Sequence, residues 1–205
     1  MDKRRHFLKI FRKAERHYGK SLKRLAAEDW GEEWQVLIAT AMSAQSRDET
    51  TIPIAEKLFK MYPTLRSMAN ASYKDVLNVF KSLNYNKTKA KHVIAAAKFI
   101  LKEYGGKVPE DLEKLVRIPG VGRKTANIVL VEVHGKHAIP TDTHVHRLSN
   151  VLGLVKTKTP ERTERELMKI VPKKYWSRVN RIFVLWGKEV RGRNKNKLLR
   201  RIECD

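Results

Sequence analysis

A Pro-Gly-Val-Gly turn between two helical segments constrains the fold of this chain more than any other feature of its sequence. The turn lies in the stretch L-V-R-I-P-G-V-G-R-K-T-A at 115–126. Pro119 ends a helix that we expect to begin at Pro109, since proline is tolerated in the first turn of a helix but not further along. The glycines permit a tight turn, and a second helix starts near Arg123. The pattern therefore predicts a helix-hairpin-helix over about 109–135.

Phosphate is the natural occupant of such a turn, because glycine leaves room for it and the free N–H groups of the second helix point toward it. We therefore expect Gly120, Val121, Gly122 and Arg123 to contact DNA. The alternative is an ordinary helix corner in which glycine only caps the first helix. Hairpins of this type usually only bind, so the turn by itself does not predict an enzyme.

Lys124 follows the turn directly and extends the prediction to catalysis. An amine attacks carbon only in its neutral form, so a lysine nucleophile needs surroundings that disfavour the ammonium ion. Partial burial beside Arg123 and a helix N-terminus would provide them. The alternative role of Lys124 is a plain phosphate contact, as expected for most lysines of a basic protein.

Asp142 supplies a carboxylate in the stretch I-P-T-D-T-H-V-H-R. It is a good N-cap for the helix that follows, and a carboxylate held there can assist departure of a base and stabilise positive charge on the sugar. His144 and His146 have no spaced partner that suggests a metal, so we interpret them as packing or supporting groups. We also expect His144 to contact DNA. Together, Lys124 and Asp142 predict lysine chemistry on a nucleotide that is held by its backbone.

The charge of the chain points to a polyanionic partner. Lysine and arginine total 44 against 22 acidic residues, a formal net charge of +22. Nucleic acid is the expected partner, and a basic protein that merely solvates itself is the alternative. Hydrophobic residues make up 41% of the chain, which is ample for a core. No apolar run approaches the ~20 residues that span a membrane, so we expect a cytoplasmic protein.

Helical periodicity dominates the sequence and predicts an all-α fold. Two of the apolar patterns have helical spacing: Trp34, Leu37, Ile38 and Met42 in one, and Ile54, Leu58 and Met61 in the other. A third helix closes at Gly105-Gly106, and another opens at Thr159-Pro160 and directs Leu167, Ile170 and Val171 inward.

A weak internal repeat relates 75–94 to 111–130. In this register Asn84 and Asn86 fall where Gly120 and Gly122 stand, and asparagine is the residue after glycine that best tolerates left-handed backbone. The repeat favours two helix-hairpin-helix units, of which the first has Thr88 in place of Lys124. Chance similarity is the alternative.

These motifs resemble the endonuclease III branch of helix-hairpin-helix base-excision DNA glycosylases. The resemblance rests on L-I-A-T-A-M-S-A-Q-S-R-D-E at 37–49, V-P-E at 108–110, the hairpin, and P-T-D-T-H-V-H-R-L at 140–148. It implies a two-lobed all-α fold. A six-helix barrel would occupy 26–136, and a second lobe would combine 1–25 with 137–205.

The resemblance also implies a bifunctional glycosylase and abasic-site lyase that acts on double-stranded DNA. Lys124 would displace the damaged base at C1′, form a Schiff base and promote β-elimination, with Asp142 as the essential carboxylate. Gln45 would fill the gap left by the flipped base. The expected lesions are oxidised pyrimidines such as thymine glycol. The alternatives are an abasic-site lyase, a glycosylase with another lesion preference, or a non-catalytic nucleic-acid-binding protein.

Two departures from the family pattern carry further expectations. Relatives usually hold an iron–sulfur cluster with four cysteines, whereas Cys204 is the single cysteine here, so we expect no cluster and no other cofactor. Basic side chains of the tail would contact phosphate instead; they are Lys188, Arg191, Arg193, Lys195, Lys197, Arg200 and Arg201. The alternative is a basic tail that is only solvated.

The other departure lies in L-N-Y-N-K-T-K at 83–89, where relatives usually carry G-L-Y-N. Tyr85 is the expected wedge into the duplex, and its neighbours Asn86 and Lys87 are expected to contact DNA. No feature of the sequence indicates an oligomer, so we expect a monomer. A compact chain without a targeting extension suits a prokaryote, where it would associate with the nucleoid.

Overall fold

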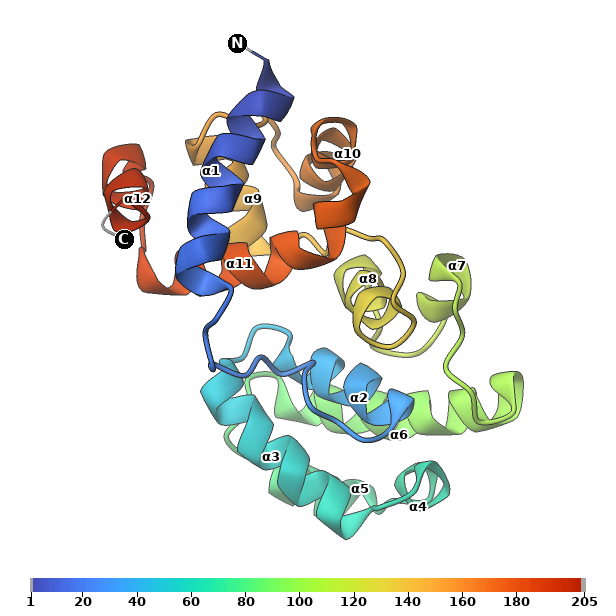
Figure 1. Ribbon diagram of the computed structural model, residues 1–205. Coiled ribbons are helices and arrows are strands. Elements are labelled where there is room, and N and C mark those ends of the chain that lie inside the picture. The colour runs from blue at the N-terminus through green and yellow to red at the C-terminus, as the bar shows by residue number, and fades with distance from the viewer. Residues whose placement is uncertain (1, 204–205) are drawn as a thin grey trace. The chain divides into compact units, whose positions relative to one another are not determined.

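The computed structural model describes residues 2–203, and within this range the secondary structure is helical without strands, which confirms the all-α prediction (Figure 1). The chain divides into two compact units. The central unit comprises Arg24–Gly135, and the terminal unit combines Met1–Lys23 with Lys136–Asp205. These boundaries lie within two residues of those expected from the sequence.

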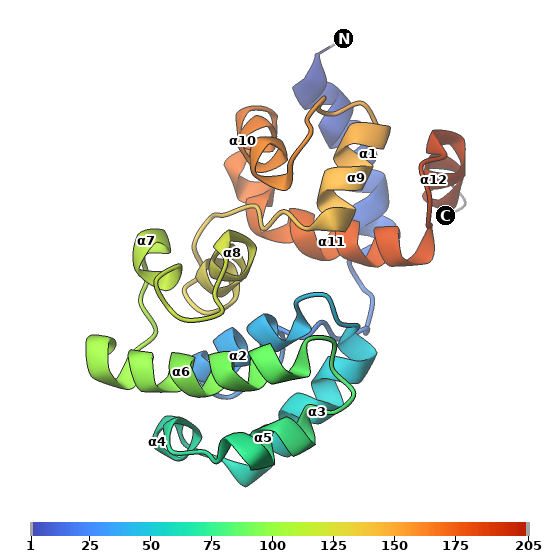
Figure 2. The same cartoon turned by 180° about the vertical axis from the view of Figure 1, so that it is seen from behind.

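The central unit contains seven of the helices. In chain order they are α2 (Glu33–Ser43), α3 (Asp48–Met61), α4 (Leu65–Ala69), α5 (Tyr73–Val79), α6 (Asn86–Tyr104), α7 (Leu112–Leu115) and α8 (Arg123–Glu132). Helices α2 and α6 lie side by side in both views (Figures 1 and 2), and α2 also packs against α3 and α8. Apolar residues surround α2 on nearly all sides, so this helix forms the centre of the unit.

The apolar pattern of α2 is confirmed, whereas that of α3 is wrong at one position. Trp34, Leu37, Ile38 and Met42 are all buried. Met61, which was expected on the inner face, is 45% exposed because it is the last residue of α3. The interior place is taken by Phe59, whose ring packs edge-on against Trp30 and Trp34 at centroid distances of 5.0 and 5.2 Å.

Helix ends follow the expected capping residues in most places. Helix α6 ends at the predicted glycine, because its C-cap is Gly105, which adopts a φ of 60°. The hairpin is an exception at its first helix, because α7 begins at Leu112 rather than at Pro109 and ends at Leu115, four residues before Pro119. Asp111 caps it by accepting a hydrogen bond from the Lys114 N–H at 2.9 Å. The second helix of the hairpin begins at Arg123, as predicted.

The internal repeat predicted the wrong residue for left-handed backbone. Tyr85 adopts a φ of 57°, and Asn84 is not among the residues with positive φ. Asn86 is already the first residue of α6, so this helix begins one residue earlier than the match to α8 required. Asn84 instead uses its side chain, which donates to the Gln45 carbonyl oxygen at 2.6 Å.

The terminal unit joins the first helix of the chain to the last ones. Its elements are α1 (Lys3–Tyr18), α9 (Thr143–Val151), α10 (Pro160–Ile170), a 3-10 turn at Lys173–Tyr175, α11 (Trp176–Glu189) and α12 (Lys195–Arg201). Thr159 caps α10 as expected, with Leu167 and Val171 buried and Ile170 half-buried.

Aromatic packing explains why both termini belong to one unit. Phe7 and Phe11 of α1 stack at 5.1 Å, and Phe11 packs edge-on against Tyr175 at 5.4 Å. The Tyr18 hydroxyl donates to Glu189 at 2.8 Å, which ties the end of α1 to the end of α11. Burial of these large rings supplies most of the driving force for the pairing.

Candidate catalytic and DNA-binding site

The two glycines of the hairpin turn are required for different reasons. Gly120 has a φ of 79°, and a Cβ atom added there would lie 2.8 Å from Cβ of His92 on α6. Gly122 is the N-cap of α8, and no atom lies within 4 Å of its added Cβ. No side chain caps α8, so its first N–H groups remain available to a phosphate. Val121 is 5% exposed, so its contact with DNA can come only from its backbone.

Alanine at the two glycines should therefore separate folding from binding. Gly120→Ala should lower the midpoint of thermal unfolding, because it imposes left-handed strain and a clash with His92. Gly122→Ala should leave that midpoint nearly unchanged yet weaken DNA binding, since its methyl group would occupy the space of the phosphate. Calorimetry and fluorescence anisotropy with a DNA duplex measure the two effects. If both variants lost DNA binding equally and neither lost stability, Gly120 would not have the folding role that is assigned to it here.

Lys124 lies in the first turn of α8, one residue after Arg123, and is half-buried. Its helix continues with six consecutive buried residues, from Thr125 to Leu130, so the backbone that carries Lys124 is held rigidly in the central unit. A lysine side chain in the first turn after an uncapped glycine turn can reach the sugar of a nucleotide whose phosphate binds that turn.

Asp142 is the N-cap of α9, as predicted. Its Oδ1 atom accepts hydrogen bonds from the N–H groups of His144 and Val145, both at 2.9 Å. Both bonds use the same oxygen, which leaves Oδ2 of the half-buried carboxylate for a further partner. The capping bonds fix the orientation of the carboxylate on a rigid helix end.

His144 packs against Gly187 of α11, where an added Cβ would lie 2.6 Å from the His144 Nδ1 atom. Burial lowers the pKa of His144 below its ordinary value; Asp142 opposes this shift, and the charges of Arg147 and Lys188 reinforce it. This packing agrees with a supporting role, while DNA contact by His144 stays a prediction. The Nδ1 atom of His146 lies 2.6 Å from the hydroxyl oxygen of Thr163, and this contact joins α9 to α10.

Arg147 is a supporting residue that the sequence did not reveal. Its guanidinium donates to the carbonyl oxygens of Gly187 at 2.8 Å and Val190 at 3.2 Å, and also to that of Gly192. These carbonyls lie at and just after the C-terminal end of α11, where a cation is favourable. Arg147 therefore joins the helix that carries Asp142 to the start of the basic tail.

The basic tail is a folded helix packed on the terminal unit. Leu198 and Ile202 are buried, and Asn194 caps α12 by accepting from the Lys197 N–H at 3.0 Å. Arg201 donates to Glu189 at 2.6 Å. Five of the seven cations that are predicted to bind phosphate are exposed, namely Arg191, Arg193, Lys195, Lys197 and Arg200.

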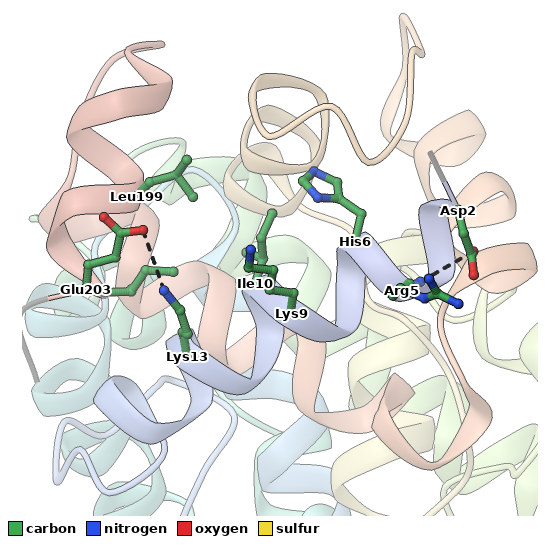
Figure 3. A pocket seen from close by; sticks show the side chains of 9 residues that line it. Asp2, Arg5, His6, Lys9, Ile10, Lys13, Leu199 and Glu203 are labelled. Atoms are coloured by element: carbon green, nitrogen blue, oxygen red, sulfur yellow. Dashed lines mark hydrogen bonds and ion pairs between the residues drawn. The ribbon is translucent and has the colours of Figure 1, made fainter.

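A cavity of about 500 Å³ lies between α1 and the tail (Figure 3). Arg5, Lys9 and Lys13 of α1 line it together with Leu199 of α12 and Ile202 just beyond that helix. Figure 3 shows Lys13 joined to Glu203, and their nitrogen–oxygen distance is 3.5 Å. The cations of α1 that line this cavity therefore lie next to Leu199 of α12 and Ile202.

The residues expected to enter the duplex lie together in the central unit. Gln45, with a φ of 55°, and Tyr85, with a φ of 57°, are exposed non-glycine residues with left-handed backbone. The side-chain amide of Asn84 joins their loops. Asn86 accepts from the Lys87 N–H at 2.7 Å, and Lys87 is exposed. Such strain persists only where the surrounding structure holds it, and it is often found at functional sites.

Lys89 is a second supporting residue that the sequence did not reveal. It is 7% exposed, and its Nζ donates to the Ser46 hydroxyl at 2.8 Å. Burial lowers the pKa of Lys89 from 10.5 to about 8. Only tertiary packing distinguishes this lysine from its exposed neighbours on α6.

Replacing Lys89 with methionine should stabilise the fold at neutral pH. Between pH 8 and 10.5 the unfolded wild type holds a proton that the folded state has lost, so its stability rises with pH. The advantage of Lys89→Met should therefore be full below pH 8 and disappear above 10.5. Urea unfolding across this range measures it, with the exposed Lys98→Met as control. An advantage that is independent of pH would contradict the prediction.

The donor atoms of the chain do not fit the iron–sulfur cluster of its relatives. A four-thiolate cluster needs four cysteines, and Cys204, the only cysteine, lies outside the described residues. Residues 2–203 contain no group of three or more His, Cys, Asp or Glu side chains placed to hold a metal ion. Within the same range, no helix is both long enough and apolar enough to cross a membrane.

Comparisons with known proteins agree with the motifs. Residues 38–173 match the HhH-GPD superfamily of base excision DNA repair proteins. Endonuclease III of Thermotoga maritima is 43% identical over 157 residues, covering 77% of this chain and 74% of the relative. Endonuclease III of Bacillus subtilis is 35% identical over 156 residues, covering 76% of this chain and 71% of the relative. A trapped endonuclease III–DNA covalent intermediate has a TM-score of 0.86 at 27% identity, covering 93% of this chain and 89% of that one. The chain therefore belongs to the endonuclease III family within the HhH-GPD superfamily.

Proposed function

We propose that this base-excision DNA glycosylase and abasic-site lyase removes oxidised pyrimidines such as thymine glycol, with Lys124 as nucleophile and Asp142 as the assisting carboxylate. The observation that carries the proposal is the position of Lys124 in the first turn of α8, directly after a glycine turn that no side chain caps. A phosphate bound at this turn brings the sugar of the same nucleotide within reach of the amine.

In the proposed reaction, the neutral Lys124 amine attacks C1′ as the bond from C1′ to the base breaks. The sugar ring then opens to a Schiff base between C1′ and the lysine nitrogen. Loss of a proton from C2′ breaks the C3′–oxygen bond, and the 3′ phosphate departs. The Asp142 Oδ2 atom, which the cap does not use, stabilises positive charge on the sugar and assists departure of the base.

We propose that Gln45 and Tyr85 occupy the duplex after the damaged base is flipped out. Flipping is required because C1′ and the base edges are shielded within the stack. Tyr85 is 66% exposed, so its ring is available to stack on bases. The left-handed backbone of both residues supports this role, since strain of this kind is retained mainly where it is used.

Borohydride trapping tests the proposal directly. The wild-type protein should form a covalent complex with a duplex that carries thymine glycol and with one that carries an abasic site. Trapping with the abasic duplex alone would reduce the function to a lyase or to a glycosylase for another lesion. Salt-sensitive binding without any trapping would favour a non-catalytic DNA-binding protein.

The basic tail is proposed to bind phosphate in place of a cluster loop. Changing Arg191, Arg193, Lys195 and Lys197 to glutamine should weaken DNA binding and reduce the salt dependence of log K by about 0.9 for each phosphate that the protein no longer neutralises. The control changes four exposed cations near α10, namely Lys156, Lys158, Arg162 and Arg165. Anisotropy titrations over a range of salt concentrations measure the slope. Equal slopes in the two variants would contradict the assignment.

The oligomeric state, the location and the source of the enzyme are proposed as well. A monomer that needs no iron–sulfur cluster would act on the nucleoid in the cytoplasm of a prokaryote. The net charge of +22 supports association with DNA, and the bacterial relatives support the source.

A further inference from the structure

In the central unit, Asn84 in the loop before α6 and Lys89 in the first turn of α6 hold two successive residues of the loop that follows α2. The Asn84 amide donates to the Gln45 carbonyl oxygen at 2.6 Å, and Lys89 Nζ donates to the Ser46 hydroxyl at 2.8 Å. Asn84 and Lys89 flank Tyr85, whose own carbonyl oxygen accepts from the Lys89 N–H at 3.0 Å. The loop that follows α2 is therefore fastened to the loop that begins α6 on both sides of Tyr85.

Among the described residues, three non-glycine residues have left-handed backbone; two of them, Gln45 and Tyr85, lie at the fastened positions, and the third is Asp29. Gln45 and Tyr85 adopt left-handed backbone although neither is a glycine, and both are exposed. Left-handed backbone in an exposed loop relaxes unless neighbouring contacts determine it. The bonds from Asn84 and Lys89 are the contacts that bridge the two loops at these positions.

Lys89 is a costly residue to use for fold stability. Its amine is desolvated, as the lowered pKa shows, and its hydrogen-bond partner is a neutral hydroxyl. An apolar side chain of similar length would avoid the desolvation and still fill the space. A residue that costs stability and fastens a strained loop fits a role in function better than a role in packing.

We propose that Lys89 is a positioning residue. With Asn84 it forms a clamp that holds Gln45 and Tyr85 in the conformation that enters the duplex. This inference rests on the proposed function of Gln45 and Tyr85. Without the clamp the two residues relax, and filling the gap must first restore their backbone conformation, which slows excision without weakening the initial binding to DNA.

The test compares Lys89→Met with Lys98→Met, which removes an exposed lysine from the same helix. We expect Lys89→Met to lower the single-turnover rate of thymine glycol excision about tenfold, with DNA affinity changed less than about twofold and the unfolding midpoint not lowered. Ser46→Ala should slow excision in the same direction, and Ser46→Thr, which keeps a hydroxyl, should restore the rate. Lys98→Met should match the wild type.

A second readout does not depend on catalysis. A duplex with 2-aminopurine opposite a tetrahydrofuran abasic analogue should fluoresce more strongly when the wild-type protein enters the gap, and less so with Lys89→Met. A lowered unfolding midpoint together with equal losses of affinity and rate would show that Lys89 is merely structural. An unchanged rate and signal, or no rise with the wild type, would overturn the clamp. If the fluorescence rises more with the wild type than with Lys89→Met but neither protein excises thymine glycol, the proposed lesion is wrong and the clamp is still supported.

Discussion

Lys124→Ala is expected to abolish borohydride trapping on both thymine glycol and abasic duplexes and to reduce strand cleavage by about a thousandfold or more. The loss is large because the Schiff base on which β-elimination depends is proposed to form on the Lys124 amine. DNA binding should weaken only slightly, with the salt slope reduced by about 1, since one cation is removed. Gel analysis of trapped complexes and single-turnover cleavage measure these effects.

Lys124→Arg is the matched control for charge. Arginine keeps the positive charge beside the glycine turn but stays protonated and cannot act as the nucleophile. The variant should therefore bind DNA as tightly as the wild type and remain inactive. A covalent complex that forms in Lys124→Ala would assign the chemistry to another amine.

Two substitutions of Asp142 should separate its effect on the excision rate from its effect on the free energy of unfolding. Asparagine is an equally good N-cap and can accept both α9 hydrogen bonds, so Asp142→Asn should keep its unfolding free energy within a few tenths of a kcal/mol. It removes the negative charge, however, and should slow base excision by about a hundredfold or more. Asp142→Ala should show the same loss of rate and a further loss of about 1 kcal/mol of stability.

Asp2→Asn is the control for these variants, because Asp2 caps α1 through hydrogen bonds from Arg4 and Arg5. It changes the same type of cap outside the site, so both rate and stability should stay near those of the wild type. Urea unfolding and single-turnover excision measure the series. Full activity in Asp142→Asn would limit the residue to capping.

Capping residues determined much of the local structure. Asp142 begins α9, Thr159 begins α10 and Gly105 ends α6, as the sequence predicted. The second helix of the hairpin likewise begins at Arg123. Such signals act through hydrogen bonds within about one turn of helix, so they can be recognised without knowing the fold. The family could be recognised for a similar reason, because its glycine turn and lysine are contiguous in the sequence.

Predictions failed where two local signals competed or where packing decided. Asp111 caps α7 more effectively than Pro109 can begin it, since its carboxylate satisfies a free N–H group. Met61 has the correct spacing for the inner face but stands at the end of its helix, where Phe59 already fills the interior. Tyr85 takes the left-handed conformation expected of Asn84, although tyrosine tolerates it less well.

The sequence by itself determined the helical class, the hairpin, the family and the two residues proposed for catalysis. Tertiary structure alone revealed the contacts that support the site. Asn84 lies 39 positions from Gln45, Lys89 lies 43 from Ser46, and Arg147 lies 40 from Gly187. No periodicity or cap relates residues so far apart. Burial and hydrogen bonding in the folded chain distinguish these side chains from the many exposed lysines, arginines and asparagines of similar sequence surroundings.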